Sequence, residues 1–335
     1  MSSHDTDRAM AEAARKSLAR DEAGLGCFLV PRVLADGSRN AVHLQALKDK
    51  LGDWSNASAE VEFAGALAER VGEAGRGIAT ILEMVALTRL DCMIASAGLM
   101  RQAVVQALHH CRQRSAFGRR LIEQPLMQNV LADLIIESEA AVALAMRVAR
   151  AVDAAPRDPR EAAFARIATA IGKYWVCKRT PSLVNEAQEC LGGLGYVETT
   201  AMTRLYRQAP LNSIWEGSGN VVCLDVLRAL GREPACREAL FKQFERARGC
   251  DHALDAAIDT LAHAIDDDAA LEVRSRAVVE DAALALQAAI LLDGDASVAE
   301  AFCRSRIARR HGLAFGTLAA DLPMSALIER ALPAI

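Results

Sequence analysis

The feature that most restricts the fold of this chain is a long helical pattern of apolar residues that begins after Gly72. Apolar side chains recur there at steps of three and four residues, which predicts one long amphipathic helix. They are Ile78, Ile81, Leu82, Val85, Cys92, Met93, Met100, Val104, Ala107, Leu108 and Cys111. Aromatic residues make up only 4% of the chain, while Ala and Leu abound. A core of packed helices is therefore favoured over a β-sandwich.

Three more helices are expected to pack with the first. Pro125 suits the first turn of a helix, and Gly192-Gly193 suit a left-handed cap at a helix end. Helices are expected from Pro125 to about Val152, from about Glu161 to Leu191 with Pro181 inside, and after Gly217-Ser218-Gly219. Four helices with short connections predict a bundle over residues 73–230. Residues 231–335 are predicted to form further helices that break at "GCD", "DDD", "DGD" and "HGL".

The first 72 residues have a different pattern. The runs "CFLVPR", "AVHLQAL" and "AEVEF" alternate partly and are separated by turn-rich segments, which predicts three β-strands. Three strands are too few for an independent sheet with two covered faces, so we expect part of a larger β layer or a small sheet against helices. The segment from Ser2 to Glu22 is polar and helix-prone. The fold class predicted is mainly α, with a β element at the start and a helical C-terminal extension.

Charge and cysteine content exclude several classes of function. The formal net charge is -4, so no overall field draws the chain to nucleic acid or to an anionic membrane. The nine cysteines are scattered without a Cys-x-x-Cys pair, and the seven histidines show no metal-ligand spacing. The sequence has no apolar signal-peptide region and no run long enough to span a bilayer. We therefore expect a cytoplasmic protein with reduced thiols, no metal site and no membrane partner.

The stretch "NSIWEGSGN", from Asn212 to Asn220, carries the strongest indication of chemistry. It places the carboxylate of Glu216 between Trp215, an apolar neighbour, and Gly217-Ser218-Gly219, which precede an apolar helical run. Backbone N–H groups at a helix start attract phosphates and other electron-rich groups. The simpler interpretation is that Ser218 caps the helix. The residues alone leave both interpretations open.

The motifs "RSAFG", "GGLGY" and "IWEGSGN", in this order, resemble the carboxy-terminal half of the acyl-CoA dehydrogenase family. The longer stretches "SAFGRRLIEQPLMQNVLADL" and "RLYRQAPLNSIWEGSGNVVCLDVLR" are similar to its AidB-like branch, which is related to isovaleryl-CoA dehydrogenase. The resemblance extends from about Gly24 to the end and weakens after Arg228. It implies that residues 1–72 contain a remnant of the family's middle β domain, that 73–230 are the four-helix C-terminal domain, and that 231–335 are an AidB-type extension.

The resemblance implies an FAD flavoprotein that oxidises an acyl-CoA thioester between its α and β carbons. In the family a base removes the α-proton while the β-carbon gives a hydride to the flavin. An α-proton is a weak acid, so the base must be desolvated, which raises the pKa of a carboxyl group. Glu216 matches the position of this base and Trp215 its apolar wall. Because the family's FAD sites straddle subunits, a homo-oligomer is expected.

The resemblance also implies a set of cofactor contacts. Arg114 and Phe117 match residues with which one subunit grips the FAD of its neighbour, although a helix-ending turn with a solvated arginine explains "RSAFG" without it. "GGLGY" matches a second loop for the FAD adenylate, but Leu194 and Glu189 replace a polar residue and a glutamine that are usual there. The expected FAD contacts are Arg114, Phe117, Gly192, Gly193, Trp215, Gly217, Ser218, Gly219 and Asn220.

Other arginines admit a structural or a functional interpretation. We interpret Arg207, and Arg89 with Asp91, as structural. AidB-type proteins bind double-stranded DNA through C-terminal helices, and the expected DNA contacts are Arg228, which matches a position implicated there, and Arg306, Arg309 and Arg310, which share one helix face. The extension carries 12 Lys and Arg against 17 Asp and Glu, so a solvated helix end is the simpler interpretation of the cluster.

A third hypothesis comes from what this sequence lacks. Full-length members of the family begin with a helical domain and the first half of a β domain, which hold the flavin ring and close the acyl pocket. Without them Glu216 would face solvent, and the chain would be a structural or interaction protein, or an inactive remnant. The sequence thus leaves three functions open: an acyl-CoA dehydrogenase, a DNA-binding protein with little dehydrogenase activity, and a shortened chain without activity.

Overall fold

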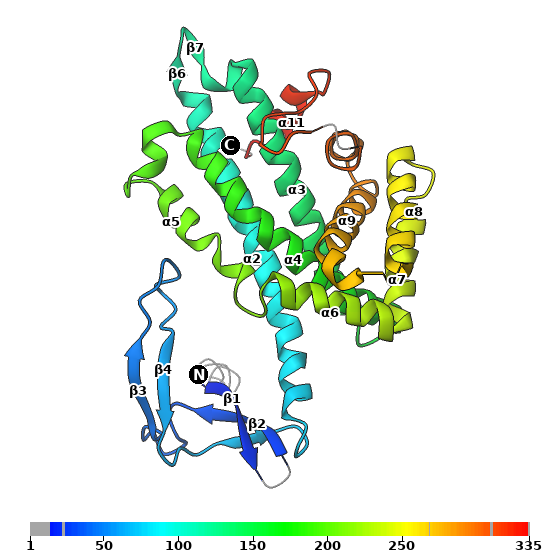
Figure 1. Ribbon diagram of the computed structural model, residues 1–335. Coiled ribbons are helices and arrows are strands. Elements are labelled where there is room, and N and C mark those ends of the chain that lie inside the picture. The colour runs from blue at the N-terminus through cyan, green and yellow to red at the C-terminus, as the bar shows by residue number, and fades with distance from the viewer. Residues whose placement is uncertain (1–13, 22–23, 268, 309–310, 334–335) are drawn as a thin grey trace. The chain divides into compact units, whose positions relative to one another are not determined.

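The long helix predicted from the apolar pattern is present as α2, Gly77–Gln113, in the computed structural model of the chain (Figure 1). The structure describes residues 14–21, 24–267, 269–308 and 311–333. Two compact units, Met1–Thr88 and Arg89–Ile335, divide the chain. Helix α2 begins in the first unit and continues through the second.

The first unit contains two small antiparallel sheets. Strand β2 pairs with β1 and with β5, and strand β3 pairs with β4, with an irregularity in the register between Leu44 and Ala46. The strands are β1 (Ala14–Asp21), β2 (Gly24–Pro31), β3 (Val42–Leu47), β4 (Ala59–Phe63) and β5 (Glu69–Val71). The three strands predicted from sequence are therefore confirmed as β2, β3 and β4.

The expectation of a helix-prone start is wrong for residues 14–21, which form strand β1. This strand pairs with β2 along its whole length, from Ala14 opposite Pro31 to Asp21 opposite Gly24. Its sequence, "ARKSLARD", has no regular alternation of apolar residues. The strand conformation follows from the partner strand, because β-structure depends more on context than on intrinsic preference. The rest of the Ser2 to Glu22 segment lies outside the described residues.

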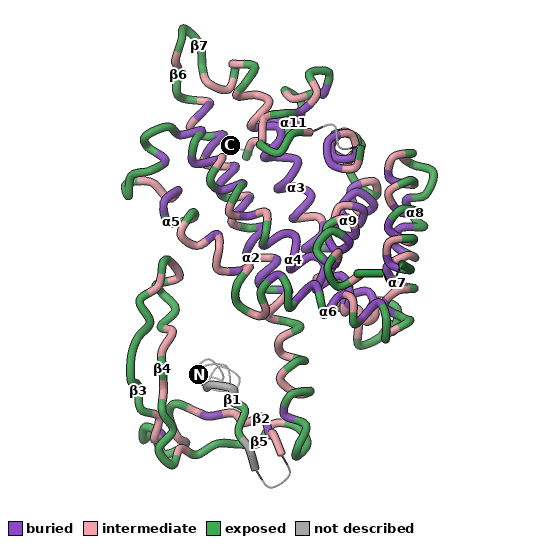
Figure 2. The backbone as a smooth tube through the Cα atoms, viewed as in Figure 1, coloured by how far each residue is buried: buried purple, intermediate pink, exposed green. Residues whose placement is uncertain are grey.

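The second unit is built on a helical core formed by α2, α3, α4 and α6. Its helices after α2 are α3 (Pro125–Ala154), α4 (Pro159–Glu189), the shorter α5 (Ala201–Gln208), which the sequence did not predict, and α6 (Gly219–Arg232). Helix α4 packs against α3 and α6, and Ser96 Oγ of α2 lies 3.3 Å from Cys177 Sγ of α4. Figure 2 shows α3 and α4 buried along much of their length. The predicted helix starts and ends are confirmed within a few residues, and Gly192 has the expected left-handed φ of 58°.

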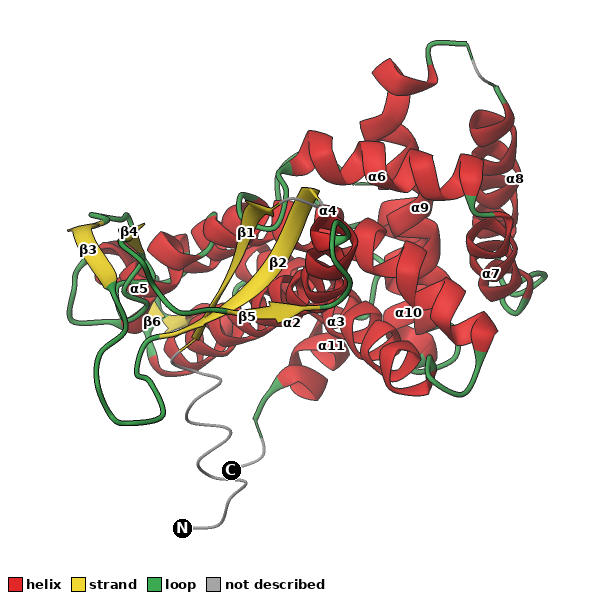
Figure 3. Cartoon of the chain, turned by 90° about the horizontal axis from the view of Figure 1, so that it is seen from below, coloured by secondary structure: helices red, strands yellow, loops and turns green. Residues whose placement is uncertain are grey.

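The C-terminal extension is helical and breaks where the sequence predicted. Its elements are α7 (Pro234–Glu245), α8 (His252–Asp266), α9 (Leu271–Leu291), α10 (Ala296–Phe302), the π-helical turn η4 (Cys303–Ile307) and α11 (Met324–Ala331). Helix α9 packs against α3, α4 and α6, and α8 packs on α9 (Figure 3). Two of the breaks end in an aspartate that caps the next helix. Asp251 accepts a hydrogen bond from the backbone N–H of Leu254 in α8, and Asp295 accepts one from the backbone N–H of Ser297 in α10.

A buried ionic network joins the extension to α3. Arg306 Nη2 of η4 lies 2.5 Å from Asp133 Oδ1 and 3.0 Å from Glu137 Oε2, both on α3. Arg179 of α4 adds an ion pair of 2.9 Å to Glu137, and His311 lies 2.7 Å from Asp133. Burial opposes ionisation of the two carboxyls, but the hydrogen bonds and the positive charges around them outweigh it, so the pKa of each lies below its usual value.

The network corrects the prediction that Arg306 contacts DNA. Its side chain is buried and its guanidinium is bound by two carboxylates, so it does not reach a phosphate at the surface. The sequence pattern misled because four arginines in ten residues resemble a solvated basic face. Arg309 and Arg310 lie outside the described residues.

We expect Arg306→Ala to lower the free energy of unfolding by about 3 to 5 kcal/mol, because it leaves the buried Asp133 with His311 as its partner and the buried Glu137 with Arg179 alone. Urea unfolding followed by circular dichroism measures the change. Arg304→Ala is the matched control, since Arg304 belongs to the same turn but pairs with the exposed Asp321, and it should lose little stability. Equal losses in both variants would contradict a structural role specific to the buried network.

Candidate active site

Glu216 lies in a turn with an unusual backbone conformation, directly before α6. Its φ is 58° and that of Gly217 is 98°, so two consecutive residues have a positive φ. This conformation is uncommon for a residue other than glycine and persists only where the surroundings hold it. The side chain of Glu216 is half-buried. The turn therefore needs specific contacts to keep its shape.

Two cations from the core supply these contacts. Arg89 of α2 donates from Nε to the carbonyl oxygen of Glu216 over 3.0 Å. Lys173 of α4 donates from Nζ to the carbonyl oxygen of Gly217. Lys173 is only 1% exposed, and burial lowers the pKa of its ammonium group. Both carbonyls of the turn are thus bound from the interior.

Asp225 of α6 fixes the position of Arg89. Its carboxylate lies 2.6 Å from Arg89 Nη1 and 2.9 Å from Arg166 Nη2 of α4. Burial opposes ionisation, but Arg166 and Arg89 together hold the pKa of Asp225 below its usual value. The expected pairing of Arg89 with Asp91 is replaced by this pair, and Asp91 is exposed. Arg89 is structural in a more specific sense than expected, because it supports the turn that carries Glu216.

Trp215 is anchored by a chain of buried hydrogen bonds. Its Nε1 donates to Asn212 Oδ1 over 3.0 Å, and Asn212 Nδ2 donates to Ser96 Oγ over 3.0 Å. Asn212 and Ser96 are both buried, whereas Trp215 keeps 37% of its surface exposed. The indole ring therefore has a fixed position beside Glu216 with part of its face free.

The start of α6 offers donors to an anionic group. Ser218 occupies the N-cap position, but its exposed side chain makes no capping hydrogen bond, so the simpler capping interpretation is not supported. A Cβ atom at Gly219 would lie 3.3 Å from Arg276 Nη2 and from Tyr174 Cε2, so glycine lets these two side chains pack close to the turn. Arg276 Nε donates to Asn220 Oδ1 over 2.8 Å. The guanidinium and the free N–H groups of the first turn are suited to a phosphate.

Phe117 lies at the tip of a two-residue hairpin. Strands β6 (Ser115–Ala116) and β7 (Arg119–Arg120) pair on either side, and Phe117 and Gly118 have φ values of 53° and 85°. Two positive φ values are typical of a type I′ turn, in which phenylalanine is rare. The Phe117 side chain is 96% exposed. A strained turn that presents an aromatic ring to solvent is a feature expected of a contact site.

The residues predicted for the cofactor fall into two groups within one chain. Trp215 to Asn220 surround the start of α6, whereas Arg114, Phe117 and Gly192-Gly193 follow the ends of α2 and α4 (Figure 1). Those two ends meet, because Cys111 Sγ lies 3.9 Å from the carbonyl oxygen of Cys190. The two groups are about 24 Å apart along α4, from Lys173 to Glu189, given the rise per residue of a helix.

The other predicted site residues are surface groups. Arg228 is exposed and lies 3.6 Å from Asp225. Arg207 pairs with Glu198 at the surface, which agrees with its structural interpretation. In the part of the chain that the structure describes, no group of three or more His, Cys, Asp or Glu is placed to hold a metal ion. No helix among these residues is long and apolar enough to cross a membrane.

Comparison with known proteins identifies the family. Residues 75–231 match the family described as "Acyl-CoA dehydrogenase, C-terminal domain". The "Putative acyl-CoA dehydrogenase AidB" of Escherichia coli (strain K12) is 48% identical over 241 residues, which are 72% of this chain and 44% of that protein. The chain belongs to the acyl-CoA dehydrogenase family. "Acyl-CoA dehydrogenase family member 11" of Caenorhabditis elegans is 34% identical over 68% of this chain and 37% of that protein, so the chain spans less than half of either relative.

Solved acyl-CoA dehydrogenase structures share the fold. The crystal structure of Caenorhabditis elegans ACDH-11 in complex with C11-CoA superposes with a TM-score of 0.79 and 28% identity, covering 92% of this chain and 59% of that one. An acyl-CoA dehydrogenase from Bacillus anthracis, complexed with FAD, superposes with a TM-score of 0.69 and 16% identity over 95% of this chain and 59% of that one. This family member is thus mainly α-helical, as predicted.

Sequence reasoning missed the residues that support Glu216. Lys173 stands between Ile171-Gly172 and Tyr174-Trp175, and a lone cation in such an apolar run is the signal that could have revealed it. Asn212 and Asp225 gave no such signal, because an asparagine before a turn and an acid in an amphipathic helix are both ordinary. Only the three-dimensional structure brings them to the turn.

We expect Arg89→Lys to loosen the Glu216 turn, because a lysine cannot bind Asp225 and the Glu216 carbonyl together as the guanidinium does. Hydrogen exchange of the peptide covering residues 213–220 should become about tenfold faster, which corresponds to about 1.4 kcal/mol of lost local stability. Arg166→Lys is the matched control, since Arg166 contacts Asp225 but not Glu216. Unchanged exchange in Arg89→Lys would remove Arg89 from the support of the turn.

Proposed function

We propose that this chain is an FAD-dependent acyl-CoA dehydrogenase in which Glu216 removes the α-proton of the thioester. The observation that carries the proposal is the left-handed turn whose two carbonyls are bound by Arg89 and Lys173. A base must keep its position within hydrogen-bond reach of the proton that it removes. The proposal rests also on membership of the acyl-CoA dehydrogenase family.

The carboxylate of Glu216 is available for this role. Among the residues that the structure describes, neither a hydrogen bond nor an ion pair engages it, although its backbone is bound. The neighbouring Trp215 is held in place by its hydrogen bond to Asn212. An unengaged carboxylate on a fixed backbone, beside an apolar ring, can accept a proton without first breaking another contact.

The residues at the start of α6 are suited to an anionic cofactor. The exposed hydroxyl of Ser218 and the guanidinium of Arg276, which lies close to Gly219, offer donors next to the base. We infer that Ser218, Asn220 and the N–H groups of this turn would hold part of the FAD. When bound, FAD accepts the hydride that leaves the β-carbon of the substrate.

A second copy of the chain explains the position of Phe117. The hairpin lies about 24 Å along α4 from the Glu216 turn, so the two do not contact the same small group within one chain. Arg114 and Phe117 would instead bind the FAD held mainly by a neighbouring copy. The exposure and strain of Phe117 support this assignment, because a ring that packs on a cofactor must first reach beyond its own chain.

We expect Glu216→Gln to bind FAD as the natural chain does and to reduce it about 100- to 10,000-fold more slowly with an acyl-CoA, because the amide cannot take the α-proton. Bleaching of the flavin absorption between about 300 and 550 nm, after FAD loading and desalting, measures the effect. Glu238→Gln, an exposed acid on α7, serves as the control. Equal bleaching rates in the natural chain and Glu216→Gln would rule out Glu216 as the base.

We expect Phe117→Ala to weaken retention of FAD about tenfold, because an aromatic ring stacked on a base contributes on that scale. The FAD content after desalting and the oligomeric state by light scattering are measured together. Val273→Ala is the matched control, since Val273 is 87% exposed on α9, away from the hairpin. Full FAD retention by Phe117→Ala would contradict a cofactor role for the hairpin.

A further inference from the structure

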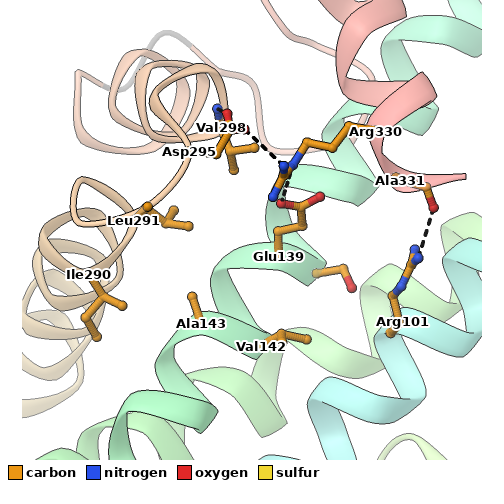
Figure 4. Close-up of a pocket in the computed structure, with 12 residues that line it drawn as sticks. Arg101, Glu139, Val142, Ala143, Ile290, Leu291, Asp295, Val298, Arg330 and Ala331 are labelled. Carbon is orange, nitrogen blue, oxygen red and sulfur yellow. Dashed lines mark hydrogen bonds and ion pairs between the residues drawn. The ribbon is translucent and has the colours of Figure 1, made fainter.

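A pocket of about 460 Å³ lies where the extension meets the bundle, away from the Glu216 turn. Side chains from α2, α3, α9, α10 and α11 line it (Figure 4). Packed interiors leave few empty spaces larger than a water molecule. The volume lies within the range of sites for small ligands. The chemistry of the lining indicates what such a ligand would be.

The first indication is an unsatisfied hydroxyl. Ser138 of α3 lines the pocket, is only 1% exposed, and its Oγ has no hydrogen-bond partner. A buried hydroxyl without a partner is costly, and native structures rarely keep one without a reason. A serine hydroxyl can rotate to donate to an acceptor that enters the pocket.

The second indication is a cation without a counter-charge. Arg101 of α2 lines the same pocket and donates from Nη2 to the carbonyl oxygen of Ala331 over 2.9 Å. Among the described residues, no carboxylate pairs with it. Arg330 differs, because Glu139 and Asp295 lie 3.2 Å and 3.0 Å from it. The lining carries two cations and two carboxylates and is neutral overall, but Arg101 keeps guanidinium N–H groups that neither carboxylate engages and that an anion can accept from.

The remaining lining is apolar. In Figure 4, Arg101 and Ile290 lie on opposite sides of the pocket, with Val142 and Ala143 between them. Leu291 lies on the side of Ile290. A ligand with an anionic end and an apolar body can contact all of these groups. We propose that this pocket binds a small apolar monocarboxylate, with its carboxylate on Arg101 and Ser138 and its chain against Val142, Ala143 and Ile290.

The test is calorimetric titration of the full chain with octanoate. The natural chain should bind octanoate. Octanamide, which has the same apolar body without the charge, should bind at least about tenfold more weakly. Arg101→Gln should weaken octanoate binding about tenfold or more, since it removes the charged donor. Arg150→Gln is the matched control, because Arg150 is an exposed arginine of α3 outside the pocket, and it should bind like the natural chain.

A second variant keeps the test independent of any effect of Arg101 on folding. Ala143→Leu should fill the apolar part of the pocket, abolish binding of octanoate and leave the circular dichroism spectrum unchanged. Glu216→Gln should leave octanoate binding as it is, so the outcome does not depend on the proposed dehydrogenase activity. The proposal is overturned if the natural chain does not bind octanoate, or if Arg101→Gln and Ala143→Leu both bind octanoate like the natural chain. One form of the first outcome is that Ala143→Leu raises stability while the natural chain binds nothing. The last result would make the pocket a packing gap filled by water.

Discussion

The buried carboxylate of Asp225 is the contact on which the candidate site depends. This side chain of α6 forms ion pairs with Arg89 of α2 and with Arg166 of α4, so it connects three helices of the core. Since Arg89 also holds the Glu216 carbonyl, the geometry of the helix packing determines the geometry of the turn. Three arginines lie around this carboxylate, since the exposed Arg228 is 3.6 Å away, and Glu233 adds a second negative charge 3.2 Å from Arg166. The geometry of the Glu216 turn and the packing of the core are therefore linked through the same group.

The C-terminal extension is joined to the core through its interior. Asp133 and Glu137 place two acids inside α3, and the extension returns with the arginine that neutralises them. Such a network contributes little net stability compared with apolar packing, but it specifies which segments meet. The extension also completes the pocket that contains Ser138 and Arg101, so this region is an integral layer of the second unit.

The helices could be predicted from sequence because their apolar periodicity and their end signals agree, as at Pro125 and Gly192. Strand β1 could not, since its residues carry no pattern and its conformation depends on a partner strand. For the site, the motif around Glu216 located the turn, but its support by Lys173 and Asp225 depends on residues far away in sequence. For Arg306 the local motif misled. Its neighbouring arginines indicated an exposed basic face, but Asp133 and Glu137, more than 160 positions earlier, bind its side chain in the interior.

The three tryptophans of the chain lie in three different environments. Trp54 is 70% exposed, Trp175 is 8% exposed, and Trp215 is intermediate at 37%. Indole emission depends on the polarity around the ring, so replacing Trp54 and Trp175 by phenylalanine would leave a single fluorophore beside Glu216. Its emission wavelength and its quenching by a nearby ring system would then report occupancy of the site from within. Trp215 is thus an intrinsic fluorescent probe of the site at which catalysis is proposed.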